Sequence, residues 1–261
     1  NNIADKNRDY SYPKILQDLL NAHFKKNGFD KQAEVYNCGI GGWVSADILI
    51  DFMLNVIYTK PDYVVLYHGL NDLPLYLTDD FLPDYSHGRK NLGEVLPVIK
   101  RAYYFPKIRF WHLYEFLKDK ILGTGNVRND VLALITKQKP VISRKFRDLT
   151  VEKDILKNIL ILCKHHSIKC ILSSFAYYCY RNDAVTIKYA EGVNIENKLR
   201  RELAEEFDVP FVDQATLIPL RDEFFVDTVH LSAEGMTILA ENFYREIISN
   251  LKHGGIFNMN Y

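Results

Sequence analysis

The sequence predicts an α/β fold in which helices cover both faces of a doubly wound parallel sheet, giving three layers. Two observations carry this prediction. Segments whose apolar residues recur at helical spacing alternate with short apolar runs along most of the chain. One run, Tyr63 to Tyr67, is apolar throughout, which is typical of parallel strands buried on both faces. Strands that alternate with helices favour a parallel sheet covered on both sides.

The composition is that of an ordinary globular domain. The chain has 261 residues, 48% of them hydrophobic and 25% charged. Lys and Arg total 33, as do Asp and Glu, so no field of one sign favours nucleic acid or an anionic membrane. No apolar run approaches the roughly 20 residues that a membrane-spanning helix requires. We therefore expect a single domain over residues 1–261, with no nucleic-acid partner and no membrane span.

The first half of the chain supplies two helices and two strands. Pro13 opens a helix that ends at Gly28, and Glu34 to Cys38 is the first predicted strand. A glycine cluster follows, and Ser45 is placed to cap the next helix. Tyr63 to Tyr67 is then the second strand.

The second half repeats the alternation. A helix is predicted around residues 155–163 and a strand at 168–173. A charged amphipathic helix at 194–207 precedes a short strand at 210–213. Ser232 then caps the last helix.

Residues 75–145 interrupt this pattern. The stretch between two strands is too long for a single crossover, which needs about 30 residues for a whole βαβ unit. It is rich in aromatic residues and punctuated by prolines. We predict an insertion, mostly helical, that contacts the rim of the ligand-binding edge of the sheet. The alternative is a separate hydrophobic cluster with no role in binding.

Three polar clusters each follow a strand, where open α/β sheets place their sites. The first is the glycine-rich run at 37–45, whose backbone N–H groups could approach a substrate oxygen. The second, at 68–72, contains Asn71, whose amide could donate to an oxyanion. In the third, Asp227 and His230 are three residues apart, so Asp could orient the imidazole.

Each cluster also has a purely structural interpretation. Glycine-rich turns between a strand and a helix are structural more often than catalytic, and Gly, Asn and Asp all form turns. The first cluster does not match the G-x-G-x-x-G fingerprint of dinucleotide binding. An Asp three residues before a His is common by chance.

The combination of the three clusters is more specific than its parts. N-x-G-x-x-G, then G-x-N-D, then D-x-x-H before the last helix resembles the SGNH (GDSL-like) hydrolase family. The resemblance implies a flavodoxin-like sheet of strand order 2-1-3-4-5. It also implies that Gly42 and Asn71 form the oxyanion hole, that His230 is the general base, and that Asp227 orients it. No cofactor and no metal are expected.

The family's nucleophilic serine block is missing from the sequence. That serine ends the first, central strand, ahead of the helix that begins at Pro13, and residues 1–12 contain neither a strand nor a GDS-type motif. We expect the natural chain to extend upstream and the serine to lie within a few residues of Asn1. The chain as given should be inactive alone and leave a gap between the strands at 34–38 and 63–67. Any signal or membrane anchor would lie in that upstream segment.

The resemblance favours a serine esterase or acyl hydrolase with a Ser-His-Asp triad. Its substrate would be a small-molecule ester, including an O-acylated carbohydrate or a lipid. Two alternatives stay open. The same residues could transfer an acyl group to a carbohydrate, or the chain could be a non-catalytic binding relative that lost the nucleophile.

Overall fold

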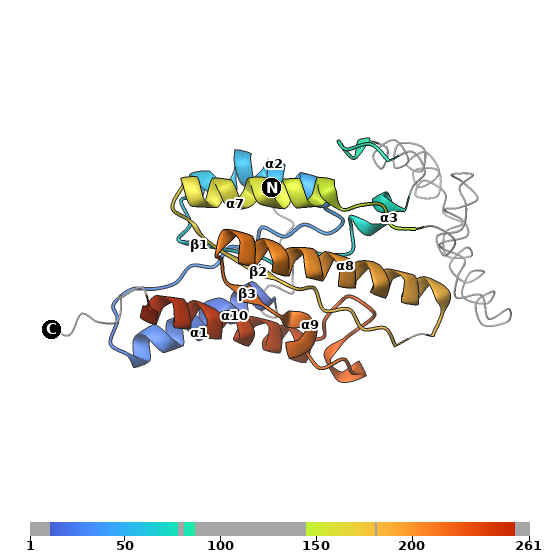
Figure 1. The fold of residues 1–261 in the computed structure, drawn as a ribbon. Coiled ribbons are helices and arrows are strands. Elements are labelled where there is room, and N and C mark those ends of the chain that lie inside the picture. The colour runs from blue at the N-terminus through green and yellow to red at the C-terminus, as the bar shows by residue number, and fades with distance from the viewer. Residues whose placement is uncertain (1–10, 78–80, 87–144, 181, 254–261) are drawn as a thin grey trace, which may run out of the picture. The chain divides into compact units, whose positions relative to one another are not determined.

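The computed structural model describes residues 11–77, 81–86, 145–180 and 182–253 (Figure 1). The chain forms two compact units, one of Asn1–Leu70 with Glu152–Tyr261 and the other of Asn71–Val151. Most of the insertion predicted at 75–145 lies outside the described residues, so its helical structure and its contact with the site stay predictions. The sheet and the helices that cover it belong to the first unit.

The sheet consists of three parallel strands in the order β1-β2-β3. They are β1 (Tyr63–Leu66), β2 (Lys169–Ser173) and β3 (Phe211–Val212). Tyr63 pairs with Lys169 at the start of β1, and Leu172 pairs with Phe211 across the other edge of β2. Four of the five residues of the central strand β2 are buried, as a strand covered on both faces requires. These three predicted strands are confirmed.

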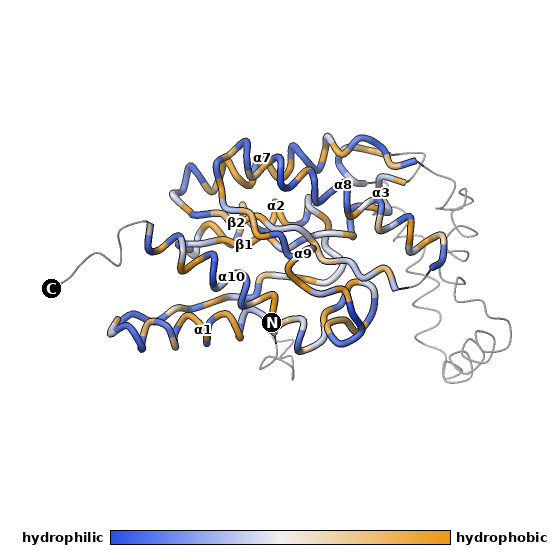
Figure 2. The backbone as a smooth tube through the Cα atoms, turned by 60° about the horizontal axis from the view of Figure 1, so that its bottom comes forward, coloured by the Kyte–Doolittle hydropathy of each residue, from blue (hydrophilic) through white to orange (hydrophobic). Residues whose placement is uncertain are grey.

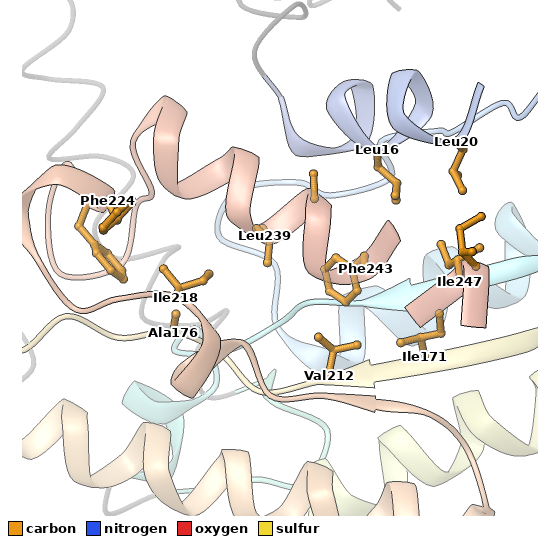
Figure 3. Packing of buried hydrophobic residues seen from close by; sticks show 13 residues of the cluster. Leu16, Leu20, Ile171, Ala176, Val212, Ile218, Phe224, Leu239, Phe243 and Ile247 are labelled. Atoms are coloured by element: carbon orange, nitrogen blue, oxygen red, sulfur yellow. The ribbon is translucent and has the colours of Figure 1, made fainter. Parts of the chain in front are cut away.

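One face of the sheet is covered by α1 (Tyr12–Lys26) and α10 (Ala233–His253) (Figures 1 and 2). Leu16 and Leu20, one helical turn apart, pack from α1 into the same cluster as residues of α10. Figure 3 shows this cluster closing onto Ile171 and Val212 of the sheet. Buried apolar residues at helical spacing therefore fix these two helices against the strands.

The other face carries α2 (Ser45–Leu54), α7 (Thr150–His165) and α8 (Ala184–Phe207) (Figures 1 and 2). α7 contributes a buried stripe of residues spaced three and four apart, which are Leu156, Ile159, Leu160 and Cys163. Helices on both faces of a parallel sheet make a three-layer α/β/α fold. The fold class predicted from the alternation of elements is confirmed.

The helix ends follow the predicted signals at two of three positions. Pro13 lies in the first turn of α1. The Ser232 hydroxyl accepts a hydrogen bond from the Gly235 N–H (3.1 Å), so this serine caps α10. The prediction for Ser45 is wrong, because Ser45 is already the first helical residue and Val44 is the N-cap. The Val44 N–H donates to the carboxylate of Asp47 (3.2 Å).

The strand predicted at Glu34–Cys38 is also wrong. The segment has no regular secondary structure, and side chains of α1 take its backbone groups. Ala33 exchanges two hydrogen bonds with the Asn21 side chain (2.7 and 3.1 Å), and the Val35 N–H donates to Gln17 Oε1 (2.9 Å). Within the described part of the chain, no segment pairs with the edge of β1 opposite β2. A segment without a neighbouring strand has no ladder to join, and here it binds a helix instead.

Candidate active site

A short loop before α10 carries Asp227 and His230. It begins and ends in an antiparallel bridge between Phe225 and Leu231. Inside this bridge the Val226 N–H donates to the His230 carbonyl oxygen (2.7 Å). The loop is therefore closed by backbone hydrogen bonds, which hold its two polar side chains close together.

The carboxylate of Asp227 accepts three hydrogen bonds from the residues that follow it. Its Oδ1 accepts from the backbone N–H groups of Val229 (2.9 Å) and His230 (2.8 Å). Its Oδ2 lies 2.7 Å from Nδ1 of His230. This contact, expected from the spacing of the two residues, assigns the Nδ1 proton to the Asp227 side of the ring. Nε2 then carries the lone pair that a general base needs.

The environment favours the charged form of Asp227. Partial burial alone would raise the pKa of this carboxyl group. The N–H groups of Val229 and His230 and the imidazole of His230 outweigh that effect, and together they hold the pKa of Asp227 below its ordinary value. Asp227 is therefore an anion under neutral conditions, as the partner of a catalytic imidazole must be.

The His230 side chain is open to the outside, with 76% of its surface exposed. Among the described residues, none makes a hydrogen bond to Nε2. An imidazole oriented through Nδ1 and accessible at Nε2 can exchange a proton with a group brought to it.

A neighbouring loop, which follows β2, supports the Asp227–His230 loop. The Tyr178 N–H donates to the Thr228 carbonyl oxygen (2.8 Å). The Tyr178 ring packs against Phe225 at 5.2 Å between centroids, and its hydroxyl donates to Asp222 (2.8 Å). Tyr178 belongs to none of the three polar clusters that the sequence predicts as site residues. Its signal was its position shortly after a predicted strand, at the edge where the sites of parallel sheets lie.

Gly235 allows α10 to begin directly against this loop. A Cβ atom added there would lie 2.2 Å from the carbonyl oxygen of Phe224, closer than any side chain can approach. The Ser232 hydroxyl also donates to the Glu223 carbonyl oxygen (2.7 Å). The helix start and the loop are therefore locked together by a close backbone contact and a hydrogen bond.

Gly42 lies in an exposed turn before α2. Its φ angle is +84°, in the left-handed region that glycine adopts without strain. The Trp43 N–H closes the turn on the Ile40 carbonyl oxygen (3.3 Å). Gly42 makes no hydrogen bond to Asp227 or His230, and within the described residues its own N–H has no acceptor. That N–H is therefore available to a ligand.

Asn71 lies in the segment that follows β1, five residues after the strand ends at Leu66. The preceding residue, Leu70, has a φ of +71°, which is uncommon for a residue with a branched side chain. Asn71 is the first residue of the second compact unit. Its convergence with Gly42 and His230 therefore stays a prediction.

The serines at the strand ends and the helix start have structural partners. The Ser173 hydroxyl donates to the Leu66 carbonyl oxygen (2.8 Å). Ser174 donates to Asp213 (2.7 Å) and accepts from the Ala215 N–H (2.9 Å). Ser232 bridges Glu223 and Gly235, as described above. None of these three hydroxyls is hydrogen-bonded to His230.

Features of a metal centre or a membrane span are absent from the described part of the chain. No group of three or more His, Cys, Asp or Glu residues there could hold a metal ion. None of the described helices is long and apolar enough to cross a membrane. A hollow lined by Lys60, Asp62 and His166 lies at the amino ends of β1 and β2, the opposite ends from the candidate residues.

Comparisons with known proteins identify the family and the fold. The model of the GDSL-like lipase/acylhydrolase family matches residues 2–238. The fold is similar to an acetyl xylan esterase (TM-score 0.54, 16% identity, 92% of each chain covered). It is also similar to a catalytic mutant of an acetylxylan esterase from Geobacillus stearothermophilus, with a TM-score of 0.55 and 20% identity over 91% of this chain and 80% of that one. A GDSL-like lipase from Bacteroides thetaiotaomicron is a third similar structure, with a TM-score of 0.50 and 18% identity over 92% of this chain and 85% of that one. The comparison with curated proteins found no match.

Proposed function

Because this chain belongs to the GDSL-like lipase/acylhydrolase family, we propose that it is a serine esterase that uses Asp227 and His230 in a catalytic triad. One observation carries the assignment. The Asp227 carboxylate holds Nδ1 of His230 at 2.7 Å and leaves Nε2 accessible. This is the geometry that lets an imidazole remove a proton from a serine hydroxyl.

The reaction proceeds in two acyl-transfer steps. As the serine oxygen attacks the ester carbonyl carbon, His230 takes the serine proton at Nε2 and then gives it to the leaving alcohol. A water molecule then gives a proton to Nε2 and bonds to the acyl carbon, the bond between that carbon and the serine oxygen breaks, and His230 returns the proton to the serine. The Gly42 N–H and the Asn71 side-chain amide donate to the oxyanion of each tetrahedral intermediate. Asp227 stays ionised and stabilises the imidazolium that forms in both steps.

The nucleophile in this proposal is a serine upstream of Asn1. Support comes from the hydroxyls of Ser173, Ser174 and Ser232, which make structural hydrogen bonds to other groups. The edge of β1 opposite β2, which pairs with no strand among the described residues, is a second support. In the flavodoxin-like order, the strand that ends in the nucleophile would pair along that edge.

The proposed substrates are small-molecule esters, with acetylated carbohydrates as the preferred class. Support for this class comes from two of the similar structures, which are acetylxylan esterases. Tyr178 and Tyr180, whose rings pack 5.3 Å apart beside the Asp227–His230 loop, offer aromatic surface near the site. Such rings could contact either a sugar or an aryl group.

Hydrolysis of 4-nitrophenyl acetate and release of acetate from acetylated xylan test this proposal. The protein in its full natural length should hydrolyse the aryl ester, and His230→Ala should lower kcat by several orders of magnitude without unfolding the chain. Release of acetate from xylan would support the carbohydrate class. Transfer of the acyl group to a sugar acceptor in place of water would indicate the transferase alternative. No turnover with either ester would favour a binding protein.

A further inference from the structure

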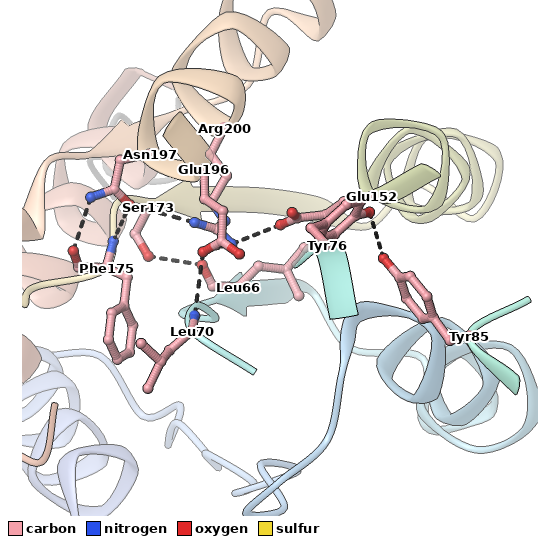
Figure 4. A network of polar contacts seen from close by, with 10 residues as sticks. All are labelled: Leu66, Leu70, Tyr76, Tyr85, Glu152, Ser173, Phe175, Glu196, Asn197 and Arg200. Carbon is pink, nitrogen blue, oxygen red and sulfur yellow. Dashed lines mark hydrogen bonds and ion pairs between the residues drawn. The ribbon is translucent and has the colours of Figure 1, made fainter. Parts of the chain in front are cut away.

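Three charged side chains are buried together between α7 and α8. Glu152 and Glu196 are fully buried, and 2% of Arg200 is exposed. Arg200 Nη2 lies 2.8 Å from Glu152 Oε1 and 3.3 Å from Glu196 Oε2 (Figure 4). Burying these charges costs desolvation free energy, and apolar side chains of similar volume in their place often give a fold that is at least as stable. Stability alone therefore does not account for these buried charges.

Glu196 reaches the loop that leads to Asn71. Its Oε2 accepts a hydrogen bond from the backbone N–H of Leu70 (3.3 Å), as Figure 4 shows. Leu70 is the residue with the left-handed backbone, a conformation that persists only when its surroundings hold it. The Glu196 carboxylate, fixed by the buried Arg200, can stabilise this conformation through its hydrogen bond to the Leu70 N–H.

Asn197, the residue of α8 that follows Glu196, binds the backbone of the loop after β2. Asn197 accepts from the Phe175 N–H (2.7 Å) and donates to the Phe175 carbonyl oxygen (2.9 Å). The Phe175 side chain in turn fills the space over Gly69, where an added Cβ would lie 2.6 Å from its ring. Arg200 also donates to Asn197 Oδ1 (3.4 Å), so one arginine supports both contacts. The backbone at Gly69 and Leu70 is thus held from α8.

We infer that Glu196 is a positioning residue that sets the backbone at Leu70 and thereby the direction of the Asn71 side chain. The inference rests on the proposed function, in which Asn71 donates to the oxyanion. Glu196 does not touch the substrate in this account. It acts through the Leu70 N–H, while Arg200 and Glu152 keep its carboxylate in place.

A double-mutant cycle between positions 196 and 71 tests the inference in the full natural chain. Asn71→Ala alone should lower kcat about 10²- to 10³-fold. Glu196→Ala should lower kcat roughly tenfold with KM within about twofold, because the loss falls on a donor used in the transition state. In the Asn71→Ala background, Glu196→Ala should cost less than about twofold more. Glu196→Gln, which keeps an acceptor for Leu70, should restore most of the activity.

Two further variants separate positioning from stability. Leu203→Ala, which empties a fully buried position of α8 and changes none of the three charges, should lower the melting temperature and leave kcat within about twofold. If Glu196→Ala does not fold, replacing all three charges together (Glu152→Leu, Glu196→Met and Arg200→Met) removes the unpaired charge. This triple variant should fold and show the same tenfold loss of kcat.

Exchange of the Leu70 amide hydrogen, followed by NMR, reports on the contact without any activity. It should be faster in Glu196→Ala, or in the triple variant, than in the wild type. The positioning role would be overturned by an unchanged exchange rate of the Leu70 amide. It would also be overturned if the kcat losses of Glu196→Ala and Asn71→Ala multiply in the double mutant. Neither result would affect the oxyanion assignment of Asn71. Full activity of Asn71→Ala would instead overturn the oxyanion assignment, and with it the catalytic purpose of this loop.

Discussion

Replacing Asp227 by Asn separates the folding of the catalytic loop from its chemistry. Asp227 accepts three hydrogen bonds, two at Oδ1 from backbone N–H groups and one at Oδ2 from the His230 imidazole. The Asn carbonyl oxygen can keep the two backbone bonds. Its NH₂ group then faces Nδ1, which must become an acceptor. The ring proton moves to Nε2, the nitrogen that should accept the serine proton.

The expected magnitudes differ greatly between the two effects. The Asn side chain keeps these contacts as neutral hydrogen bonds in place of charge-assisted ones, so the unfolding free energy should fall by about 1 kcal/mol. The wrong imidazole tautomer should lower kcat about 10⁴-fold. Asp227→Ala removes all three acceptor contacts, and it should cost about 1–3 kcal/mol of stability on top of the same loss of rate.

Hydrolysis of 4-nitrophenyl acetate by the full natural chain, measured beside thermal unfolding, tests this separation. Asp222→Asn is the matched control, since Asp222 lies near the loop and its one hydrogen bond with a described side chain, from the exposed Tyr178 hydroxyl, can be kept by the Asn oxygen. The control should keep kcat within about twofold. An Asp227→Asn enzyme that retains a tenth or more of the wild-type kcat would refute the role assigned to this carboxylate.

Three further predictions follow from the packing and charge of the same unit. Gly235→Ala forces a Cβ against the Phe224 carbonyl oxygen, so it should lower both kcat and the melting temperature, with a stability loss of about 1–3 kcal/mol in urea unfolding. Phe243→Ala empties a fully buried position and should cost about 3–5 kcal/mol, whereas exposed Leu54→Ala should stay within about 0.5 kcal/mol; equal losses would contradict the core described above. Because the folded-state pKa of Asp227 is depressed, its ionisation stabilises the fold fully above the unfolded pKa of about 3.9, and this contribution is lost as pH falls through the folded value. The difference in melting temperature between the wild type and Asp227→Asn should therefore be constant near neutral pH and shrink below about pH 4, and a gap that widens in acid would oppose this assignment.

The parts of the fold that the sequence predicted well are those with strong periodicity. The helices α1, α7 and α10 bury regular apolar stripes, and the strand at 63–66 is a continuous apolar run that is half-buried throughout, so the type and approximate position of these elements could be predicted. Boundaries were less accurate. α8 begins at Ala184, ten residues before the predicted start, because Asp183 caps it through the Val185 and Thr186 N–H groups.

The misplaced strand at 34–38 failed for a different reason. A strand is defined by its partner as much as by its own residues. Here the Asn21 and Gln17 side chains take the hydrogen bonds that a ladder would have made. Nothing in the local pattern of apolar residues distinguishes these two outcomes.

The candidate site was predictable only where its residues are close in sequence. Asp227 and His230, three residues apart, meet as the spacing indicated. The support from Tyr178 and Glu196 depends on contacts between residues far apart in the chain, 50 residues from Tyr178 to Thr228 and 126 from Leu70 to Glu196. Such contacts become visible only in the folded chain.

The most direct test of a serine esterase that uses His230 is covalent labelling of its nucleophile. The full natural chain would be treated with a fluorophosphonate, and the modified residue identified by mass spectrometry of its peptides. The account predicts one adduct, on a serine preceding Asn1, and its loss in His230→Ala. No adduct, an adduct on Ser173, Ser174 or Ser232, or undiminished labelling of the His230 variant would contradict it.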